Sequence, residues 1–341
     1  MHIYIDESGT FTIPLLKTPA ISCVVALVIP DAVHDEMLSG FEDLIQSLGL
    51  DIKSVKGREL HETHIAAIVR YLNQFDVILE VTAIEMAMQT VTGIYHHKQR
   101  QAHGLITNLN DTHLPSLVAD MTQWRDKVMK LPNQLYTQAV CMWELVAKTI
   151  QKSTLYYAQR HPQELGSFHW FIDAKDKSKM SAYDDLWSTL VMPVLQSRSF
   201  REPFIQLVEG DYRYFDRFCG SKPETPRHLI ADTGLKSPFD YVDMKSVLHE
   251  HLSVATAADC LGLRLVDVIA NALRRSMNGN LQRAGWDGLA VLMVQSERRA
   301  QVINLIDLST EPRPKFARDP AYYQVIPHCE AYARPLLLPG D

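Results

Sequence analysis

A run of nine apolar residues, 21–29 (ISCVVALVI), constrains the fold of this chain more than any other segment. The run is rich in β-branched residues and lacks the alternating polar side chains of a strand with one wet face, so it predicts a central strand. Pro30 ends the run, and apolar side chains then recur at helical spacing over residues 31–48. A buried strand beside amphipathic helices predicts an α/β protein.

The rest of the chain alternates in the same way. Further strands are predicted at residues 77–86, 167–172 and 204–208, and helices at residues 59–75, 134–152, 181–196, 259–277 and about 289–301. Asp259 is the predicted N-terminal cap of its helix. Residues 90–130 are polar and helical in character, which predicts an insertion. We expect one α/β domain over residues 1–310, with this helical insertion, and a Pro-rich tail of low order over residues 311–341.

Composition bounds the class of protein. Of the 341 residues, 46% are hydrophobic and 22% are charged, an ordinary globular balance. No apolar run approaches the ~20 residues of a spanning helix, and the opening residues do not resemble a signal peptide. Five scattered cysteines without a CxxC pair favour a reducing cytoplasm and no structural zinc. The net charge of −6 argues against a broad electropositive surface but leaves a local basic groove open.

Residues 4–9 (YIDESG) carry the first chemical signal. Ile3 and Ile5 alternate with polar residues, which predicts a short strand that ends in acid at the carboxyl edge of the sheet, where open α/β sheets hold ligands. Asp6 and Glu7 point to opposite faces unless the strand has already ended. The plainer alternative is an acidic turn with Gly9 at positive φ.

Two later aspartates share this kind of position. Asp173 follows the predicted strand 167–172, and Asp267 lies within a predicted helix whose neighbours Leu263 and Ala270 are apolar. A carboxylate on a partly buried face costs several kcal/mol unless it is paired or bound to metal. Asp267 is therefore either a metal ligand or the partner of an arginine inside the fold.

Carboxylates that converge repel each other unless a cation neutralises them. Mg²⁺ and Mn²⁺ accept carboxylate oxygens, and two such ions can clamp both sides of a phosphodiester during in-line displacement. Asp6, Asp173 and Asp267 suit this chemistry if their strands are neighbours. Lys56 is a candidate to contact a phosphate, as are Lys175, Lys177 and Lys179 after Asp173.

Other site patterns fit less well. His61 and His64 are three residues apart and lack the HExxH spacing of zinc proteases, so a solvated helix start explains them better. The sequence has no GxGxxG, no GxxxxGK[ST] and no GxSxG motif, which argues against the common dinucleotide, phosphate-loop and serine-hydrolase sites.

Four features together resemble one family. They are YIDESG, the segment Val55-Lys56-Gly57, the aspartate that ends a middle strand, and the helix pattern LxLxDxIA at residues 263–270. The resemblance is to the bacterial and phage family called domain of unknown function 3800, which belongs with the ribonuclease-H-like folds. It implies a mixed sheet flanked by helices, with Asp6, Asp173 and Asp267 as metal ligands.

Ribonuclease-H-like enzymes often add a fourth acid, for which Glu144 is the best positional candidate and Glu7 or Glu59 are alternatives. The family's late helix usually reads QLAD, whereas residues 264–267 read RLVD. Two hypotheses follow: a Mg²⁺- or Mn²⁺-dependent nuclease that acts on nucleic acid, with Lys56 or Lys175 stabilising developing charge, or a catalytically inactive ribonuclease-H-like binding or signalling subunit, for example in a defence system. The acidic net charge and the altered QLAD box favour the second.

Overall fold

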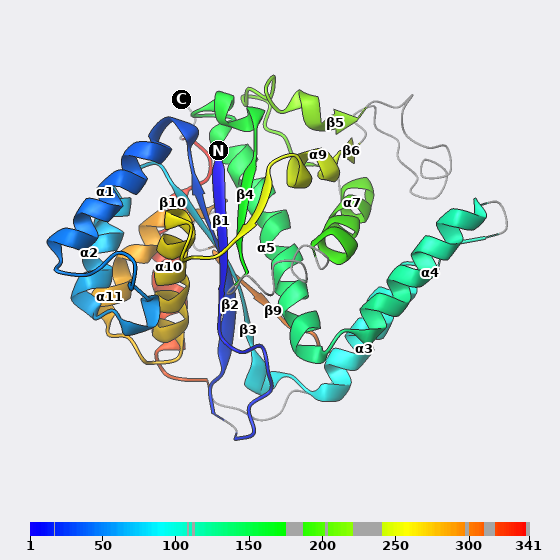
Figure 1. The fold of residues 1–341 in the computed structure, drawn as a ribbon, viewed down its shortest axis with the longest axis horizontal. Coiled ribbons are helices and arrows are strands. Elements are labelled where there is room, and N and C mark those ends of the chain that lie inside the picture. The colour runs from blue at the N-terminus through cyan, green and yellow to red at the C-terminus, as the bar shows by residue number, and fades with distance from the viewer. Residues whose placement is uncertain are drawn as a thin grey trace.

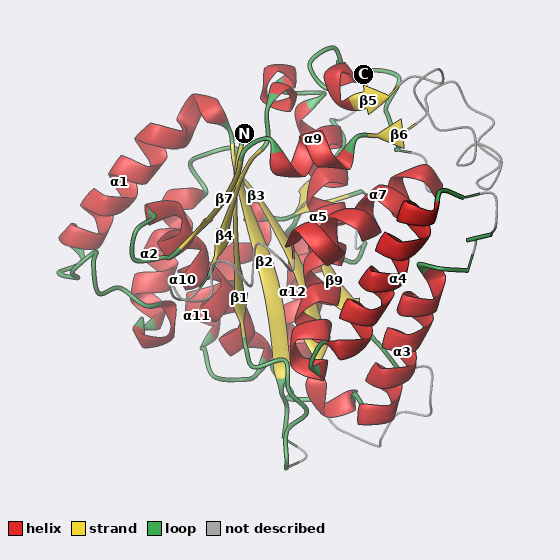
Figure 2. Cartoon of the chain, turned by 45° about the vertical axis from the view of Figure 1, so that its right-hand side comes forward, coloured by secondary structure: helices red, strands yellow, loops and turns green. Residues whose placement is uncertain are grey.

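A six-stranded mixed sheet organises the chain (Figures 1 and 2). The computed structural model describes residues 1–16, 18–107, 109–110, 113–174, 187–201, 204–220, 241–296, 300–309 and 318–338. The strand order is β7-β4-β1-β2-β3-β9. The strands are β1 (His2–Ser8), β2 (Ile21–Ile29), β3 (Ile78–Glu85), β4 (His169–Asp173), β7 (Leu252–Ala255) and β9 (Ile303–Ile306).

Strand β2 lies in the middle of this sheet, and all nine of its residues are buried, which confirms the predicted central strand. It pairs antiparallel with both β1 and β3. Strand β4 runs parallel to β1, β7 parallel to β4, and β9 parallel to β3. The sheet is therefore mixed and flanked by helices, which confirms the α/β prediction.

Helices cover both faces (Figure 1). One face packs against α1 (His34–Ser47), α2 (Glu62–Leu72), α10 (Leu261–Met277), α11 (Arg283–Trp286) and α12 (Tyr322–Tyr332). We call it the α10 face. The opposite face, here the α5 face, packs against α5 (Asn133–Tyr157), α7 (Met192–Arg201) and α9 (Met244–His249). The sheet separates two hydrophobic layers, so the direction of a strand side chain decides which helices it meets.

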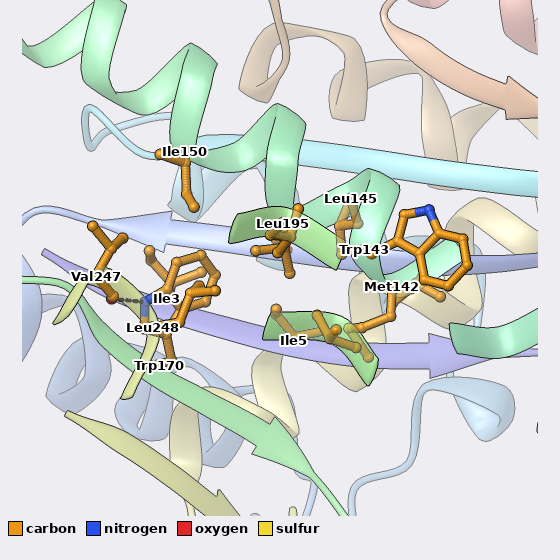
Figure 3. Packing of buried hydrophobic residues seen from close by; sticks show 14 of the residues in the cluster. Ile3, Ile5, Met142, Trp143, Leu145, Ile150, Trp170, Leu195, Val247 and Leu248 are labelled. Carbon is orange, nitrogen blue, oxygen red and sulfur yellow. Dashed lines mark hydrogen bonds between the residues drawn. The ribbon is translucent and has the colours of Figure 1, made fainter. Parts of the chain in front are cut away.

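Strand β1 shows this alternation directly. Ile3 and Ile5 are fully buried on the α5 face, where Ile5 lies near Met142 of α5 and Ile3 lies near Leu248 of α9 (Figure 3). Tyr4 points the other way, into the layer under α10. The even-numbered residues of β1 therefore lie on the α10 face, and the odd-numbered ones on the α5 face.

The polar segment after β3 forms two helices, α3 (Val91–Gly104) and α4 (Pro115–Lys130), which lie side by side and extend away from the sheet (Figure 1). Their helical character agrees with the prediction for residues 90–130. Helix α4 buries only Val128 among its described residues, so this pair adds little to the core.

The predicted opening strand is β1, which continues through Asp6 and Glu7 to Ser8, so these two side chains point to opposite faces. Other local predictions are wrong. Residues 204–208 form no strand, and Val208 is almost fully exposed. Helix α10 begins at Leu261 with Cys260 as N-cap, whereas the carboxylate of Asp259 accepts a hydrogen bond of 2.8 Å from the Thr256 hydroxyl. The side chain of Asp259 is thus used in the preceding turn instead of the cap.

The C-terminal part also differs. The predicted helix at about 289–301 is replaced by a 3₁₀ helix, Asp287–Leu292, and the short strand β8 (Val294–Gln295). The predicted low-order tail contains α12, which buries Tyr322, Val325, Ile326 and Cys329, and β10 (Arg334–Pro335), which pairs with β8. A further two-stranded sheet joins β5 (Cys219–Gly220) and β6 (Tyr241–Val242).

The helix predicted at residues 181–196 is described only from residue 187, as a π-helical turn, Trp187–Val191, that leads into α7. No helix in the described part of the chain is long and apolar enough to cross a membrane.

Candidate functional site

Asp6 and Asp173 lie side by side. Strands β1 and β4 are parallel, and their last registered pair is Ile5 with Ile172, so Asp6 and Asp173 are the next residues on the two strands. Neighbouring strands are ~4.8 Å apart. Both side chains point to the α10 face, because Tyr4 and Phe171, two positions earlier on each strand, stack there with ring centroids 4.7 Å apart.

Both carboxylates are buried and held by backbone amides. Asp6 is 3% exposed and Asp173 is 6% exposed. Asp6 Oδ1 accepts a 2.7 Å hydrogen bond from the amide of Glu7, and Asp173 Oδ1 accepts one of 2.9 Å from the amide of Ala257. Amide donors favour the charged form of a carboxylate, whereas burial and a second acid beside it oppose that form.

Helix α10 runs alongside β1 and brings the third aspartate level with Asp6. Gly262 packs against Tyr4 so closely that a Cβ atom built on it would lie 2.3 Å from the ring. Nine residues later in α10, the Asn271 side chain accepts a hydrogen bond from the Ser8 hydroxyl. Nine helical residues span ~13.5 Å, which matches the ~13 Å between Tyr4 and Ser8 along the strand. Asp6, halfway between these strand positions, is therefore opposite the turn of α10 that carries Asp267.

The side chain of Asp267 is half-buried and anchored at both oxygens. Oδ2 accepts a 2.9 Å hydrogen bond from the amide of Gly57, and Oδ1 accepts one of 2.8 Å from the Asn271 side chain. This environment differs from the predicted alternative, in which an arginine inside the fold pairs with Asp267. The partners are a backbone amide and a neutral amide, so no cation among the described residues pairs with Asp267 at these two oxygens.

A chain of hydrogen bonds then connects α10 to the end of β1. The Ser8 hydroxyl donates to Asn271 Oδ1 at 3.2 Å, and Arg274 Nε donates to Ser8 Oγ at 2.9 Å. Arg274 is thereby held near the strand that carries Asp6. Cys23 of β2 lies close enough to feel both Arg274 and Asp6. Burial raises the pKa of its thiol to about 12; the Arg274 guanidinium opposes this shift, and the Asp6 carboxylate adds to it.

The Lys56-Gly57 segment is fixed against the same helix. A Cβ atom on Gly57 would lie 2.7 Å from both the Asp267 carbonyl oxygen and the Val268 Cα, so only glycine allows this approach. Arg275 of α10 donates to the carbonyl of Leu60 at 2.7 Å. The exposed side chain of Lys56 therefore starts directly beside Asp267.

The other predicted acids lie elsewhere. Glu7 is buried on the α5 face, because β1 remains a strand at this residue. Glu144 belongs to α5, also on that face, and Arg198 of α7 donates to both of its carboxylate oxygens at 3.2 and 3.1 Å. Glu59 is exposed and pairs with Arg58 at 3.2 Å. The structure therefore places Asp6 beside Asp173, and Asp267 beside the Lys56-Gly57 segment, but brings none of these glutamates to either place.

Other candidates stay separate from this group. Lys175, Lys177 and Lys179 lie outside the described residues. His61 and His64 sit at the start of α2 with ring centroids 5.9 Å apart. Within the described ranges, no three or more His, Cys, Asp and Glu side chains form a group that could hold a metal ion.

The chain matches no protein-family model, no curated protein and no solved structure. The resemblance to the family named above therefore rests on the sequence motifs alone.

Proposed function

We propose that the chain is a metal-dependent nuclease that hydrolyses phosphodiester bonds. The observation that carries this proposal is the placement of Asp6 and Asp173 on neighbouring parallel strands, on the face covered by α10. Two adjacent buried carboxylates repel unless a cation lies between them. The mixed sheet flanked by helices also agrees with the ribonuclease-H-like architecture that the motifs imply.

The donor set suits Mg²⁺ or Mn²⁺. These hard cations take carboxylate oxygens, and proteins often hold Mg²⁺ with only one or two carboxylates, leaving the other positions to water and substrate phosphate. Asp6 and Asp173 would supply the two carboxylates, with Asp267 as the third acid from α10. When bound, the ion would polarise a phosphoryl oxygen and activate water for in-line attack.

Basic side chains at the edge of the site would bind the substrate backbone. Lys56 is exposed next to Asp267, and Arg274 is held beside Ser8. Both can pair with phosphate oxygens without reading the base sequence. Asp267 would position Lys56 through its hydrogen bond to the amide of Gly57.

The direct test is cleavage of single- and double-stranded DNA and RNA with Mg²⁺ and with Mn²⁺. We expect Asp6→Asn and Asp173→Asn each to lower the cleavage rate by at least about 10²-fold, because each removes a charged metal ligand. Asp35→Asn, at a fully exposed aspartate of α1, is the matched control and should cut like the wild type. Equal cleavage by wild type and Asp6→Asn would reject the proposal.

One observation favours the second hypothesis, an inactive ribonuclease-H-like binding or signalling subunit. Both carboxylate oxygens of Asp267 already accept hydrogen bonds that fix the Lys56 segment and Asn271. Such an aspartate serves the fold even without a metal. In that case the wild-type chain cuts no nucleic acid with either metal ion, yet retains its folded structure when Asp6 is changed to Asn.

A further inference from the structure

A cavity lies on the α5 face of the sheet, away from the aspartates. It has a volume of about 500 Å³ and is bordered by β3, α5, β9 and the segments around residues 205–207 and 336–337. We call it the Glu80 cavity, after the β3 residue that lines it. Ligand pockets for small organic molecules typically enclose roughly 300–1,000 Å³, so the space suits a molecule of mononucleotide size.

The cavity contains a carboxylate that its surroundings satisfy only in part. Glu80 is 1% exposed, and Lys152 Nζ contacts its Oε2 at 2.7 Å. Its Oε1 has no hydrogen-bond partner among the described residues and is closed to solvent, so a ligand in the cavity would reach it through a rotation of the Glu80 side chain. Burial raises the pKa of Glu80, and the Lys152 ammonium opposes that shift. A buried carboxylate oxygen without a donor is costly, so a ligand that donates an N–H here would be favoured.

The Lys148 ammonium group lines the same cavity and has no counterion among the described residues. Lys148 of α5 is one turn before Lys152, is half-buried, and makes no hydrogen bond or ion pair with another described residue. It acts on Glu80 only through its charge. Two ammonium groups against one carboxylate leave the cavity with an excess positive charge, which suits an anionic ligand.

The remaining walls are largely apolar. Leu155 and Leu336 are buried, and Leu207 is half-buried, where they line the cavity. Apolar walls with a few convergent polar groups are typical of sites for small organic ligands. An inorganic anion alone would use Lys148 but would leave Glu80 Oε1 and these walls without contacts.

We propose that the Glu80 cavity binds an organic anion of mononucleotide size that carries an amino group. The anionic group would pair with Lys148, the amino group would donate to Glu80 Oε1, and the body of the ligand would contact the leucines. The inference is independent of the proposed nuclease function, because the sheet separates the two sites.

Isothermal titration with AMP, GMP, CMP and UMP tests this proposal on the full chain. We expect at least one of the three nucleotides with an exocyclic amino group to bind at millimolar concentration or below, and UMP to bind more weakly. Lys148→Met and Glu80→Gln should each weaken binding by about tenfold or more, because each removes a charged partner. Lys130→Met, at an exposed lysine of α4, should leave binding unchanged.

Inorganic phosphate and the matching nucleosides complete the titration. We expect each to bind at least about tenfold more weakly than the nucleotide, since neither uses both ends of the cavity. The absence of nucleotide binding, equal affinity of Lys148→Met and wild type, or equal affinity for inorganic phosphate would overturn the proposal. Thermal melting checks that Lys148→Met folds, and titration without a divalent cation keeps this outcome separate from that of the nuclease test.

Discussion

Arg264 links two stretches of backbone to helix α10. Its guanidinium donates to the carbonyls of Ile52 at 2.6 Å, Ala257 at 3.1 Å and Ala258 at 2.8 Å. It is one of two positions at which residues 264–267, RLVD, differ from the QLAD pattern that they resemble. The fixed fork of an arginine suits several acceptors at once. Arg264 therefore has a structural role, in holding the loop that donates an amide to Asp173.

Gly57 provides a residue-level test of how the Lys56 segment is placed. In Gly57→Ala, the added methyl group would meet the α10 backbone at 2.7 Å and weaken the hydrogen bond to Asp267. We expect a loss of about 1–3 kcal/mol in the free energy of unfolding, measured by urea denaturation.

Gly104→Ala is the matched control for that measurement. No atom lies within 4 Å of a Cβ built on Gly104. Alanine is also the better helix former, so this change should be neutral or stabilising by up to about 1 kcal/mol. If Gly57→Ala and Gly104→Ala have the same free energy of unfolding, the close approach of Gly57 to α10 does not matter for stability.

At the scale of elements, imidazole rings stack across one end of the sheet. His2 of β1 stacks on His34 of α1 with ring centroids 3.6 Å apart, and on His169 of β4 at 4.9 Å. His169 in turn stacks on His251 at 4.4 Å. Burial lowers the pKa of His2 to about 4, with His34 as the next cause, although Asp31 opposes the shift. Burial and then His251 lower the pKa of His169.

These lowered pKa values predict a loss of stability in acid. Between pH 6.5 and about 4 the unfolded chain binds a proton at His2 that the folded chain does not, so the stabilisation is present above pH 6.5 and is lost as the pH falls. In this window His2 alone adds a slope of up to about 1.4 kcal/mol per pH unit. His2→Phe should reduce the measured slope of unfolding free energy against pH by about this amount. Equal slopes for variant and wild type would contradict the assignment.

Long, strongly patterned elements could be predicted from the sequence, and short ones could not. Strand β2 and helix α5 carry continuous apolar or helical patterns and appear close to where they were expected. Strands β7 and β9 have four residues each, too few for a periodic signal, and were not predicted. Residues 204–208 have β-like composition, yet no strand pairs with them, because pairing depends on neighbours that are distant in sequence.

At the scale of the whole molecule, the sheet separates the acidic side chains according to the face to which each one points. Asp6 and Glu7 are adjacent in sequence but lie on opposite faces, and only the α10 face also carries Asp173 and Asp267. The sequence identified these three aspartates as candidates by their position. The proximity of Asp6 to Asp173 depends on the register of β1 with β4, which is not encoded locally.

The central claim is that Asp6 and Asp173 share a divalent cation. Anomalous diffraction from crystals soaked in Mn²⁺ tests it most directly, because it locates the ion itself. We predict an anomalous peak in contact with a carboxylate oxygen of both Asp6 and Asp173, since two adjacent buried acids need a shared cation. A map in which Mn²⁺ is absent from these two carboxylates would contradict the claim.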